Sequence, residues 1–355
     1  MISPGTRVGD RYRVLSYIDS GGMQDVYKAY DELTEETVAL KTPQAGQAKK
    51  RFHSSAQLSG RVNHHNVAKT YDFFESQGSF YLIEELVEGT TLEKATLSIM
   101  PQIDPHMAAY LLIRIAKGLA ASHNAGVAHR DLKPSNVLVD DTLTEVKITD
   151  FGIATLADSL FEEVVRIGDL TKSTSGTIRG ALPYMAPEMM FRKPGDYVGK
   201  EADIWSLSAM TFRLMTGEYP FGEGMMVPVN VQNNTRTRWP SFMTTNSQFA
   251  PLAQSLMEIV DECLVYDKSK RPTAEVLVQR CESLCFNYVP RTTGTIQRRI
   301  GATRGFIVAE DGQSIFFHDD SIYGKLSAQL GAKVSFSQYP GAPAPRAHPV
   351  MVLGS

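Results

Sequence analysis

The run His129-Arg130-Asp131-Leu132-Lys133-Pro134-Ser135-Asn136, followed by Asp150-Phe151-Gly152, decides the fold of this chain of 355 residues. Transfer of a phosphoryl group needs a carboxylate that orients the attacking hydroxyl, a cation near the transferred group and oxygen ligands for magnesium. Asp131 suits the first role and Lys133 the second. Asn136 and Asp150 supply the oxygen ligands. The order and spacing of these residues therefore indicate phosphoryl-transfer chemistry.

Both motifs resemble the catalytic loop and the metal-binding motif of the protein kinases, and the Lys-Pro pair in the first is typical of the serine/threonine class. The resemblance is to bacterial-type (Hanks-type) kinases and covers residues 12–288. It implies a bilobal α+β fold, with a small lobe over 12–87 and a large lobe over 88–288. It also implies ATP and Mg²⁺ as cofactors and a protein substrate. The residues that it makes catalytic are Asp131, Lys133 and Lys41, and those that it assigns to the metal are Asn136 and Asp150.

The composition of the chain limits which partners and which cellular location are expected. Hydrophobic residues make up 43% of the chain, as in packed globular proteins. The net charge of −3 gives no general argument for a nucleic-acid partner, but from Pro290 onward seven basic side chains stand against four acidic ones. Three cysteines, an odd and sparse set, predict reduced thiols and a cytoplasmic location. No apolar run approaches transmembrane length, so no membrane partner is expected.

The segment from Asp19 to Ala29 stands where the kinase family has its glycine-rich phosphate loop. That loop needs glycines so that backbone N–H groups can approach the phosphates of ATP. Only the middle glycine position, Gly21, is kept, with Gly22 beside it, while Asp19 and Gln24 replace the other two. The alternative is a plain hairpin turn. The flanking strand pattern favours an altered nucleotide loop, in which the acid weakens phosphate binding.

The stretch Val38-Ala39-Leu40-Lys41 is a buried-strand pattern that ends in lysine. It resembles the family's third strand, whose lysine contacts the α- and β-phosphates. The resemblance assigns the following residues to the nucleotide site: Gly21, Gly22, Val26, Ala39, Lys41, Glu85, Val87 and Leu138.

Helix C departs from the family pattern. The glutamate that normally pairs with the strand lysine is replaced by Ser55, and residues 51–62 contain no acid. Ser59 falls in a hydrophobic stack where an apolar residue is usual. The match also puts Glu84 at the gatekeeper position, where a buried charge needs a partner. We therefore hypothesise that Glu84 pairs with Lys41 and replaces the missing acid.

The activation segment runs from Asp150 to Glu188 and is rich in hydroxyl residues. Such a loop can be merely flexible, but Arg130 before the catalytic aspartate favours binding of a regulatory phosphate. Ala181 stands where serine/threonine kinases have a threonine that ties the substrate loop to the catalytic residues, which puts peptide turnover in doubt. The candidate phosphorylation sites are Thr171, Ser173, Thr174, Ser175 and Thr177. Two further motifs match the large lobe: Asp203 as a prop of the catalytic loop, and Glu188 with Arg271 as an ion pair.

After Tyr288 the kinase pattern ends, and short strands with turn signals follow over 291–354. Their order resembles a cold-shock domain, a small all-β barrel of the OB type that binds single-stranded nucleic acid on aromatic and basic side chains. The residues carried over are Arg304, Phe306, Phe316, Phe317 and His318. Because strand faces alternate, at least one of the three phenylalanines is expected in the core. The segment 340–345 is expected to be the loop before the last strand.

Three functions stay open from sequence alone. The leading one is a serine/threonine kinase whose tail docks nucleic acid or a partner. The second is a pseudokinase scaffold that binds nucleotide with little turnover, favoured by Ser55, Ala181, Asp19 and Gln24. The third is a nucleic-acid-binding regulator. The substrate, the activating signal and the oligomeric state are not encoded in recognisable motifs.

Overall fold

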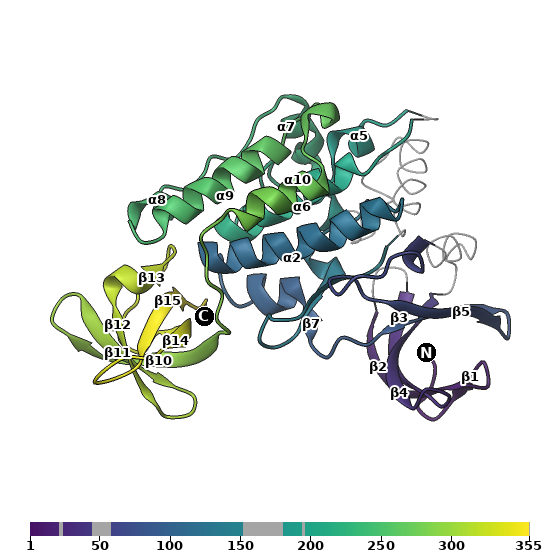
Figure 1. Ribbon diagram of the computed structural model, residues 1–355, viewed down its shortest axis with the longest axis horizontal. Coiled ribbons are helices and arrows are strands. Elements are labelled where there is room, and N and C mark those ends of the chain that lie inside the picture. Colours follow the sequence, from purple (N-terminus) through teal and green to yellow (C-terminus); the bar gives the residue numbers. More distant parts are fainter. Residues whose placement is uncertain (21–23, 45–57, 152–179, 194–195, 355) are drawn as a thin grey trace.

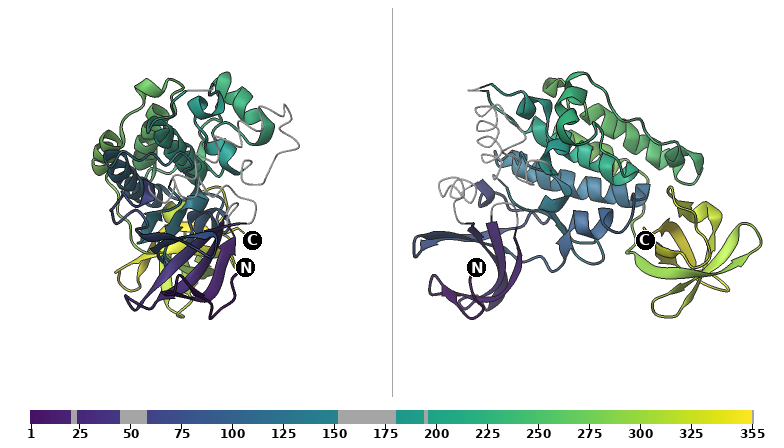
Figure 2. Two further views of the ribbon diagram at one scale, coloured as in Figure 1. Left: turned by 90° about the vertical axis from the view of Figure 1, so that its right-hand side faces the viewer. Right: turned by 180° about the vertical axis from the view of Figure 1, so that it is seen from behind.

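The computed structural model describes residues 1–20, 24–44, 58–151, 180–193 and 196–354. Figure 1 shows a β-rich small lobe at the lower right, a helical large lobe above it, and a β-barrel at the lower left. The rear view in Figure 2 shows the same order, with the barrel and the small lobe at opposite ends of the large lobe. Among the described residues, no helix is both long and apolar enough to cross a membrane.

The small lobe is a six-stranded antiparallel sheet in the order β1-β2-β3-β4-β6-β5. Its strands are β1 (Arg7–Val8), β2 (Tyr12–Ser20), β3 (Gln24–Asp31), β4 (Glu36–Pro43), β5 (Thr70–Ser76) and β6 (Ser79–Glu85). β4 is buried along most of its length, as its run of apolar residues predicts. In the β4–β6 pair Ala39 lies opposite Glu84. Because residues two apart share a face, Lys41 and Glu84 are diagonal neighbours on one face of the sheet.

The large lobe is built around the buried helix α2 (Pro105–Asn124), which packs against α6, α9 and α10. Asp104 caps α2 by accepting hydrogen bonds from the backbone N–H groups of His106 and Met107, and Pro105 occupies the first turn, where no N–H donor is needed. The sequence pattern predicts this helix over residues 107–125, within two residues of its observed ends. At 20 residues α2 is about 30 Å long, and its far end leads into the catalytic loop.

The remaining elements of the large lobe are short strands and turns near the cleft and helices behind it. They are β7 (Thr90–Thr91), the π-helix η1 (Glu93–Leu97), η2 (Pro134–Asn136), β8 (Val137–Val139), β9 (Val146–Ile148), η3 (Leu182–Tyr184), α5 (Pro187–Met190), α6 (Glu201–Thr216), η4 (Gly224–Met226), α7 (Val227–Gln232), α8 (Phe242–Thr245), α9 (Ala250–Cys263), η5 (Lys268–Lys270) and α10 (Ala274–Glu282). The hairpin of β8 and β9 joins the catalytic loop to Asp150 and so sets their spacing.

The C-terminal body is all β. Its strands are β10 (Thr292–Ile300), β11 (Arg304–Ala309), β12 (Ser314–His318), β13 (Ile322–Tyr323) after the turn η6 (Asp319–Ser321), β14 (Lys333–Tyr339) and β15 (Arg346–Val352). The order β12-β11-β10-β14-β15 is closed by a β12–β15 pairing, so five strands form a barrel around a core that includes Ile296, Ile307 and Phe336. The strands expected from sequence are confirmed, and residues 340–345 form the loop before β15.

The barrel is docked on the large lobe. Arg291 reaches back to the Asp104 carboxylate at 2.5 Å, and both side chains are buried. Phe249 at the start of α9 packs on Tyr323 of β13, with ring centroids 5.0 Å apart. Gly324 lies so close to the large lobe that a Cβ there would stand 2.1 Å from the side-chain nitrogen of Gln102. The barrel therefore packs against the large lobe near the first turn of α2, at the opposite end of that helix from the catalytic loop.

Candidate active site

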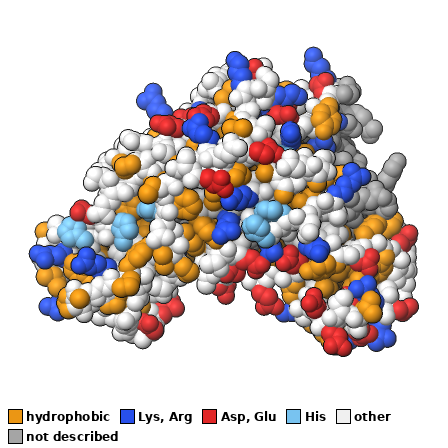
Figure 3. Space-filling view, in the orientation of Figure 1, with side chains coloured by type: hydrophobic (Ala, Val, Ile, Leu, Met, Phe, Trp, Pro, Cys, Tyr) orange, Lys and Arg blue, Asp and Glu red, His pale blue; other side chains and the backbone are white. Residues whose placement is uncertain are grey.

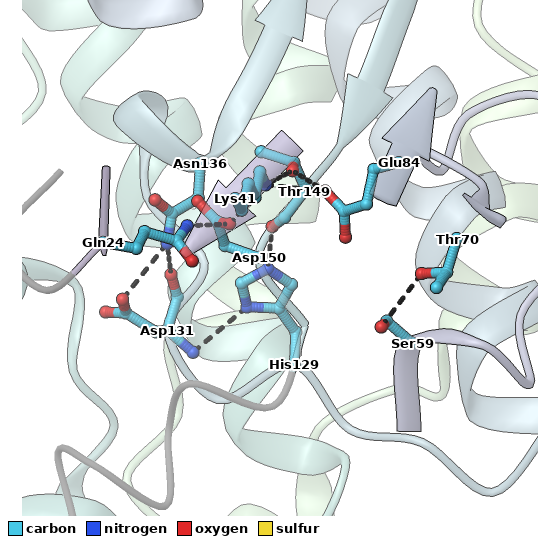
Figure 4. Close-up of polar contacts among 10 residues, drawn as sticks. All are labelled: Gln24, Lys41, Ser59, Thr70, Glu84, His129, Asp131, Asn136, Thr149 and Asp150. Atoms are coloured by element: carbon cyan, nitrogen blue, oxygen red, sulfur yellow. Dashed lines mark hydrogen bonds and ion pairs between the residues drawn. The ribbon is translucent and has the colours of Figure 1, made fainter. Parts of the chain in front are cut away.

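The catalytic-loop residues converge on one carboxylate. Asp131 Oδ2 accepts hydrogen bonds from Lys133 Nζ at 2.8 Å and from Asn136 Nδ2 at 3.1 Å. The same Asn136 amide donates to the backbone carbonyl of Asp131 at 2.8 Å, and Asn136 itself ends η2, directly before β8. The sequence-predicted Asp131, Lys133 and Asn136 therefore form one hydrogen-bonded unit, and Figure 4 shows the contact between Asp131 and Asn136.

Asp203 of α6 fixes the backbone of this loop, as its motif predicts. Its carboxylate accepts from the backbone N–H of His129 at 2.8 Å and of Arg130 at 2.6 Å, and it contacts His123 Nε2 at 2.8 Å. Arg130 has a φ of +64°, a strained conformation for a residue with a side chain. Burial disfavours the charged form of Asp203, but the hydrogen bond and charge of His123, the charge of His129 and the backbone N–H of Arg130 together outweigh it and lower the pKa of Asp203. The ionised carboxylate thus holds the strained turn.

His129 links the catalytic loop to the residues before the Asp-Phe-Gly motif. Its Nδ1 accepts from the backbone N–H of Asp131 at 3.2 Å, so its Nε2 must carry the proton that it shares with the carbonyl of Thr149 at 2.9 Å. The ring also lies against Phe151, with centroids 4.7 Å apart. These contacts give His129 a structural role, in which it braces the catalytic loop against Thr149 and Phe151.

On the small-lobe side of the cleft, Lys41 is shared between two carboxylates. Its Nζ lies 2.7 Å from Asp150 Oδ1 and 2.6 Å from Glu84 Oε2, and it donates to the Thr149 hydroxyl at 2.9 Å (Figure 4). Lys41 and Glu84 are 5% and 3% exposed, so the pair is buried. The expected pairing of Glu84 with Lys41 is confirmed.

Burial and the neighbouring charges shift the pKa values of Lys41, Glu84 and Asp150. Burial would lower the pKa of Lys41, but Asp150 and Glu84 outweigh it and raise that pKa. For Glu84 burial dominates, so its pKa is raised although Lys41 opposes the shift. For Asp150 burial opposes ionisation, but the charge and hydrogen bond of Lys41, the hydrogen bond from Gln24 and the charge of His129 together outweigh it, and its pKa is lowered. Asp150 is therefore the carboxylate held ionised, as a metal ligand requires.

Gln24 makes a contact that sequence reasoning missed. Its Nε2 donates to Asp150 Oδ1 at 2.7 Å, and the side chain is 6% exposed. The sequence identifies Gln24 as a replacement of a loop glycine, but nothing in one sequence says where a long side chain there would point. Asp19, the other replacement, pairs across the cleft with Lys94 of η1 at 3.0 Å.

Of the residues predicted to surround the nucleotide, Val26, Ala39, Glu85 and Leu138 lie on β3, β4, β6 and β8, and Val87 follows β6. Ala39 and Val87 are buried, whereas Val26 and Leu138 are partly exposed. Glu85, expected to contribute its backbone, is held by Lys147 at 2.7 Å. Gly21 and Gly22 lie outside the described residues.

Several regulatory predictions also fall outside the described residues: Ser55 of helix C and the hydroxyls Thr171, Ser173, Thr174, Ser175 and Thr177. Ser59 is described, and its hydroxyl accepts from Thr70 of β5 at 3.0 Å. Arg130 Nε is buried and has no hydrogen-bond partner in the described part of the chain. The predicted pair of Glu188 and Arg271 is confirmed, with bonds of 2.7 and 2.9 Å.

The barrel corrects one residue of the predicted nucleic-acid face. Phe317 is 1% exposed in the barrel core, because β12 alternates and its neighbours on either side point outward. Phe306 and Phe316 are opposite one another on β11 and β12, partly exposed, with ring centroids 5.8 Å apart. Arg304 lies opposite His318 on the same two strands. Figure 3 shows basic and histidine side chains gathered at the outer end of the barrel.

The fold and the cleft define a protein kinase, and comparison agrees. The family model of the protein kinase domain matches residues 12–281, so the chain belongs to the protein kinase family. Serine/threonine-protein kinase PrkC of Bacillus subtilis is 32% identical over 222 residues, which cover 61% of this chain and 32% of PrkC. Serine/threonine-protein kinase pkn2 of Myxococcus xanthus is 34% identical over 284 residues, which cover 77% of this chain and 32% of pkn2. The match thus spans about a third of the length of these curated relatives.

Members of this family use ATP and Mg²⁺. The donor set here fits that cation, because Asp150 offers an ionised carboxylate and Asn136 turns its amide nitrogen to Asp131, leaving its oxygen as the ligand atom. Within the described ranges, no group of three or more His, Cys, Asp or Glu side chains forms a metal cage.

Proposed function

We propose that the protein is an ATP- and Mg²⁺-dependent serine/threonine protein kinase with residues 12–288 as its kinase domain. The observation that supports this proposal most strongly is the presence of two carboxylates that are each bound by a cationic side chain. Asp131 is bound by Lys133 and Asn136, and Asp150 is bound by Lys41. One site suits a hydroxyl acceptor and the other a metal–phosphate complex.

In this mechanism Asp131 orients the substrate hydroxyl and accepts its proton as the hydroxyl attacks the γ-phosphorus. Lys133 is already bound to Asp131 at 2.8 Å, so its charge lies beside the reacting group and offsets the negative charge that develops on the phosphoryl oxygens. Lys41 would orient the other phosphates. Bound Mg²⁺ would neutralise phosphate charge, with Asn136 and Asp150 as its protein ligands.

Glu84 is proposed to do the work of the helix C glutamate. In the family an acid on helix C positions the strand lysine, whereas Ser55 cannot supply a charge. The buried contact of 2.6 Å between Lys41 Nζ and Glu84 Oε2 supports the replacement. Because Glu84 lies on β6, directly paired to the strand of Lys41, this anchor does not depend on the position of helix C.

The second candidate is a pseudokinase scaffold, which Ala181 and Gln24 favour. The separating experiment incubates the full chain with labelled ATP and Mg²⁺ and a set of serine- and threonine-containing proteins. Label transfer that is lost in Asp131→Ala supports the kinase. Nucleotide binding without transfer to protein or to the chain itself, under all conditions, would favour the scaffold. Label on residues 171–177 would identify the predicted activation sites.

For residues 291–354 we propose an OB-type, cold-shock-like barrel that binds single-stranded nucleic acid. Phe306 and Phe316 form a partly exposed aromatic pair, and the residues paired beside them are Arg298 on β10 and Arg346 on β15. Paired residues of neighbouring strands share a face, so the arginines flank the rings. Such a combination suits bases that stack and phosphates that need cations. Fluorescence titration of labelled single strands should show affinity that falls with salt and that Phe306→Ala weakens. Affinity unchanged by Phe306→Ala would contradict the proposal.

A further inference from the structure

Gln24 occupies the junction between the phosphate loop and the metal-binding carboxylate. It is the first residue of β3 and lies within the segment from Asp19 to Ala29, at the last glycine position of the family's glycine-rich loop. Figure 4 shows Gln24 and Lys41 converging on Asp150. Both donate to one atom, Asp150 Oδ1, at 2.7 Å each. A glycine at this position would leave that contact to Lys41 alone.

Two donors on one carboxylate oxygen oppose metal binding there. Mg²⁺ requires near-ideal octahedral geometry and close oxygen ligands, so an approaching ion competes with N–H groups already pointed at that oxygen. Lys41 has a second carboxylate, Glu84, to which it is bound at 2.6 Å, and keeps a charged partner when Asp150 turns to a metal. The bond of Gln24 is buried, and a hydrogen bond to a charged group in such a place is stronger than one in water.

We propose that Gln24 is a positioning residue that holds Asp150 in the absence of metal and is displaced by Mg²⁺–nucleotide, so that it sets the Mg²⁺ concentration at which the nucleotide site fills. This inference rests on the proposed kinase function and adds to it a metal threshold built into the phosphate loop. A glutamine in place of the loop glycine would then lower the affinity for nucleotide at low Mg²⁺ and make nucleotide binding depend more strongly on the Mg²⁺ concentration.

The test measures binding rather than turnover. The affinity of the full chain for a non-hydrolysable imido analogue of ATP is determined by titration calorimetry over a series of Mg²⁺ concentrations and in EDTA. Gln24→Met keeps the side-chain volume without the donor, and Gln24→Gly restores the residue usual in the family. Both should lower the Mg²⁺ concentration for half-maximal binding by about tenfold, the worth of one charge-assisted hydrogen bond.

The matched control is Gln44→Ala. Gln44 Nε2 donates to Asp25 Oδ1 at 3.2 Å, an amide–carboxylate contact of the same small lobe that does not involve Asp150. Its Mg²⁺ requirement should equal that of the unmodified chain, and thermal unfolding of all variants checks that each is folded.

An unchanged or increased Mg²⁺ requirement in both Gln24 variants would overturn the inference; an increase would mean that Gln24 supports the bound nucleotide instead. In either case the analogue still binds, and the proposed kinase function stands. If the folded, unmodified chain binds no analogue at any Mg²⁺ concentration, the inference and the proposed function fall together.

Discussion

Asp203 on the large-lobe side of the cleft and Glu84 on the small-lobe side are both buried carboxylates, but they face different partners. Asp203 accepts from two backbone N–H groups, which cannot move without refolding the catalytic loop. Glu84 shares one lysine side chain with Asp150. The pKa of Asp203 is lowered and that of Glu84 is raised. The large lobe thus holds its charge with fixed donors, whereas the small lobe divides one cation between two acids.

The difference suggests which polar contacts of the cleft stay fixed during the reaction cycle and which ones rearrange. Fixed donors preorganise the residues that touch the reacting hydroxyl. A lysine with two acceptors, and a glutamine on one of them, can redistribute when nucleotide and metal arrive.

Asp203→Asn should damage the fixed side most. The amide keeps one oxygen but points a donor at one of the N–H groups, so a buried contact becomes a clash of donors. We expect the free energy of unfolding to fall by about 3 kcal/mol or more. Urea denaturation followed by circular dichroism measures it. A change below about 1 kcal/mol would mean that the carboxylate does not brace the loop.

Arg291→Met should be nearly as harmful, because it leaves Asp104 buried without its cation at the start of α2. The expected loss is about 2–4 kcal/mol, towards that of breaking a buried ion pair. Lys325→Met is the matched control. It removes a partly exposed pair with Glu218 in the same contact between barrel and large lobe, where about 0–1 kcal/mol is expected. Equal losses in the two variants would refute the distinction.

The barrel contact should also weaken in acid. His348 stacks on Phe249 with centroids 5.1 Å apart and lies near His106, Asp104 and Arg291. Burial lowers the pKa of His348, and the charge of His106 adds to that shift. The unfolded histidine therefore takes up its proton first, and stability present above about pH 6.5 is lost as the pH falls below it.

Unfolding in urea at pH 7.5 and 5.5 measures this loss, and His348→Phe should reduce the difference between the two values. The phenyl ring keeps the stacking and removes the proton. A pH dependence that is the same in both proteins would assign it to other groups.

Lys94→Met should have the smallest effect. Its pair with Asp19 is exposed at both ends, with side chains 60% and 53% accessible, so about 0–1 kcal/mol of stability is at stake. Because the pair spans the cleft, we expect the change mainly in the KM for ATP, measured by steady-state kinetics at low and high salt. A salt-independent KM in the unmodified chain would show that this pair does not act on the nucleotide loop.

The fold and much of the candidate active site can be predicted from the sequence. The run around Asp131 and the strand that ends in Lys41 predict that both motifs lie at one cleft, because the kinase fold always brings these two motifs together between its lobes. The match of Glu84 to the gatekeeper position, the missing acid of helix C and the need of a buried charge for a partner together predicted the contact between Glu84 and Lys41.

The remaining contacts depend on tertiary geometry. Phe317 and Phe316 are adjacent and chemically identical, so strand register alone decides which one enters the core. Nothing local links Arg291 to Asp104, which lie 187 residues apart. The reach of Gln24 to Asp150 depends on how the two lobes close, which no single sequence reports.

The most direct test of the account is a double-mutant cycle on Lys41 and Glu84, with kcat/KM for ATP as the readout. If Glu84 positions Lys41, Glu84→Met should lower kcat/KM about tenfold or more in the unmodified chain, and should change it little when Lys41→Met is already present. Undiminished activity in Glu84→Met, or an equal loss in both backgrounds, would contradict the replacement of the helix C acid.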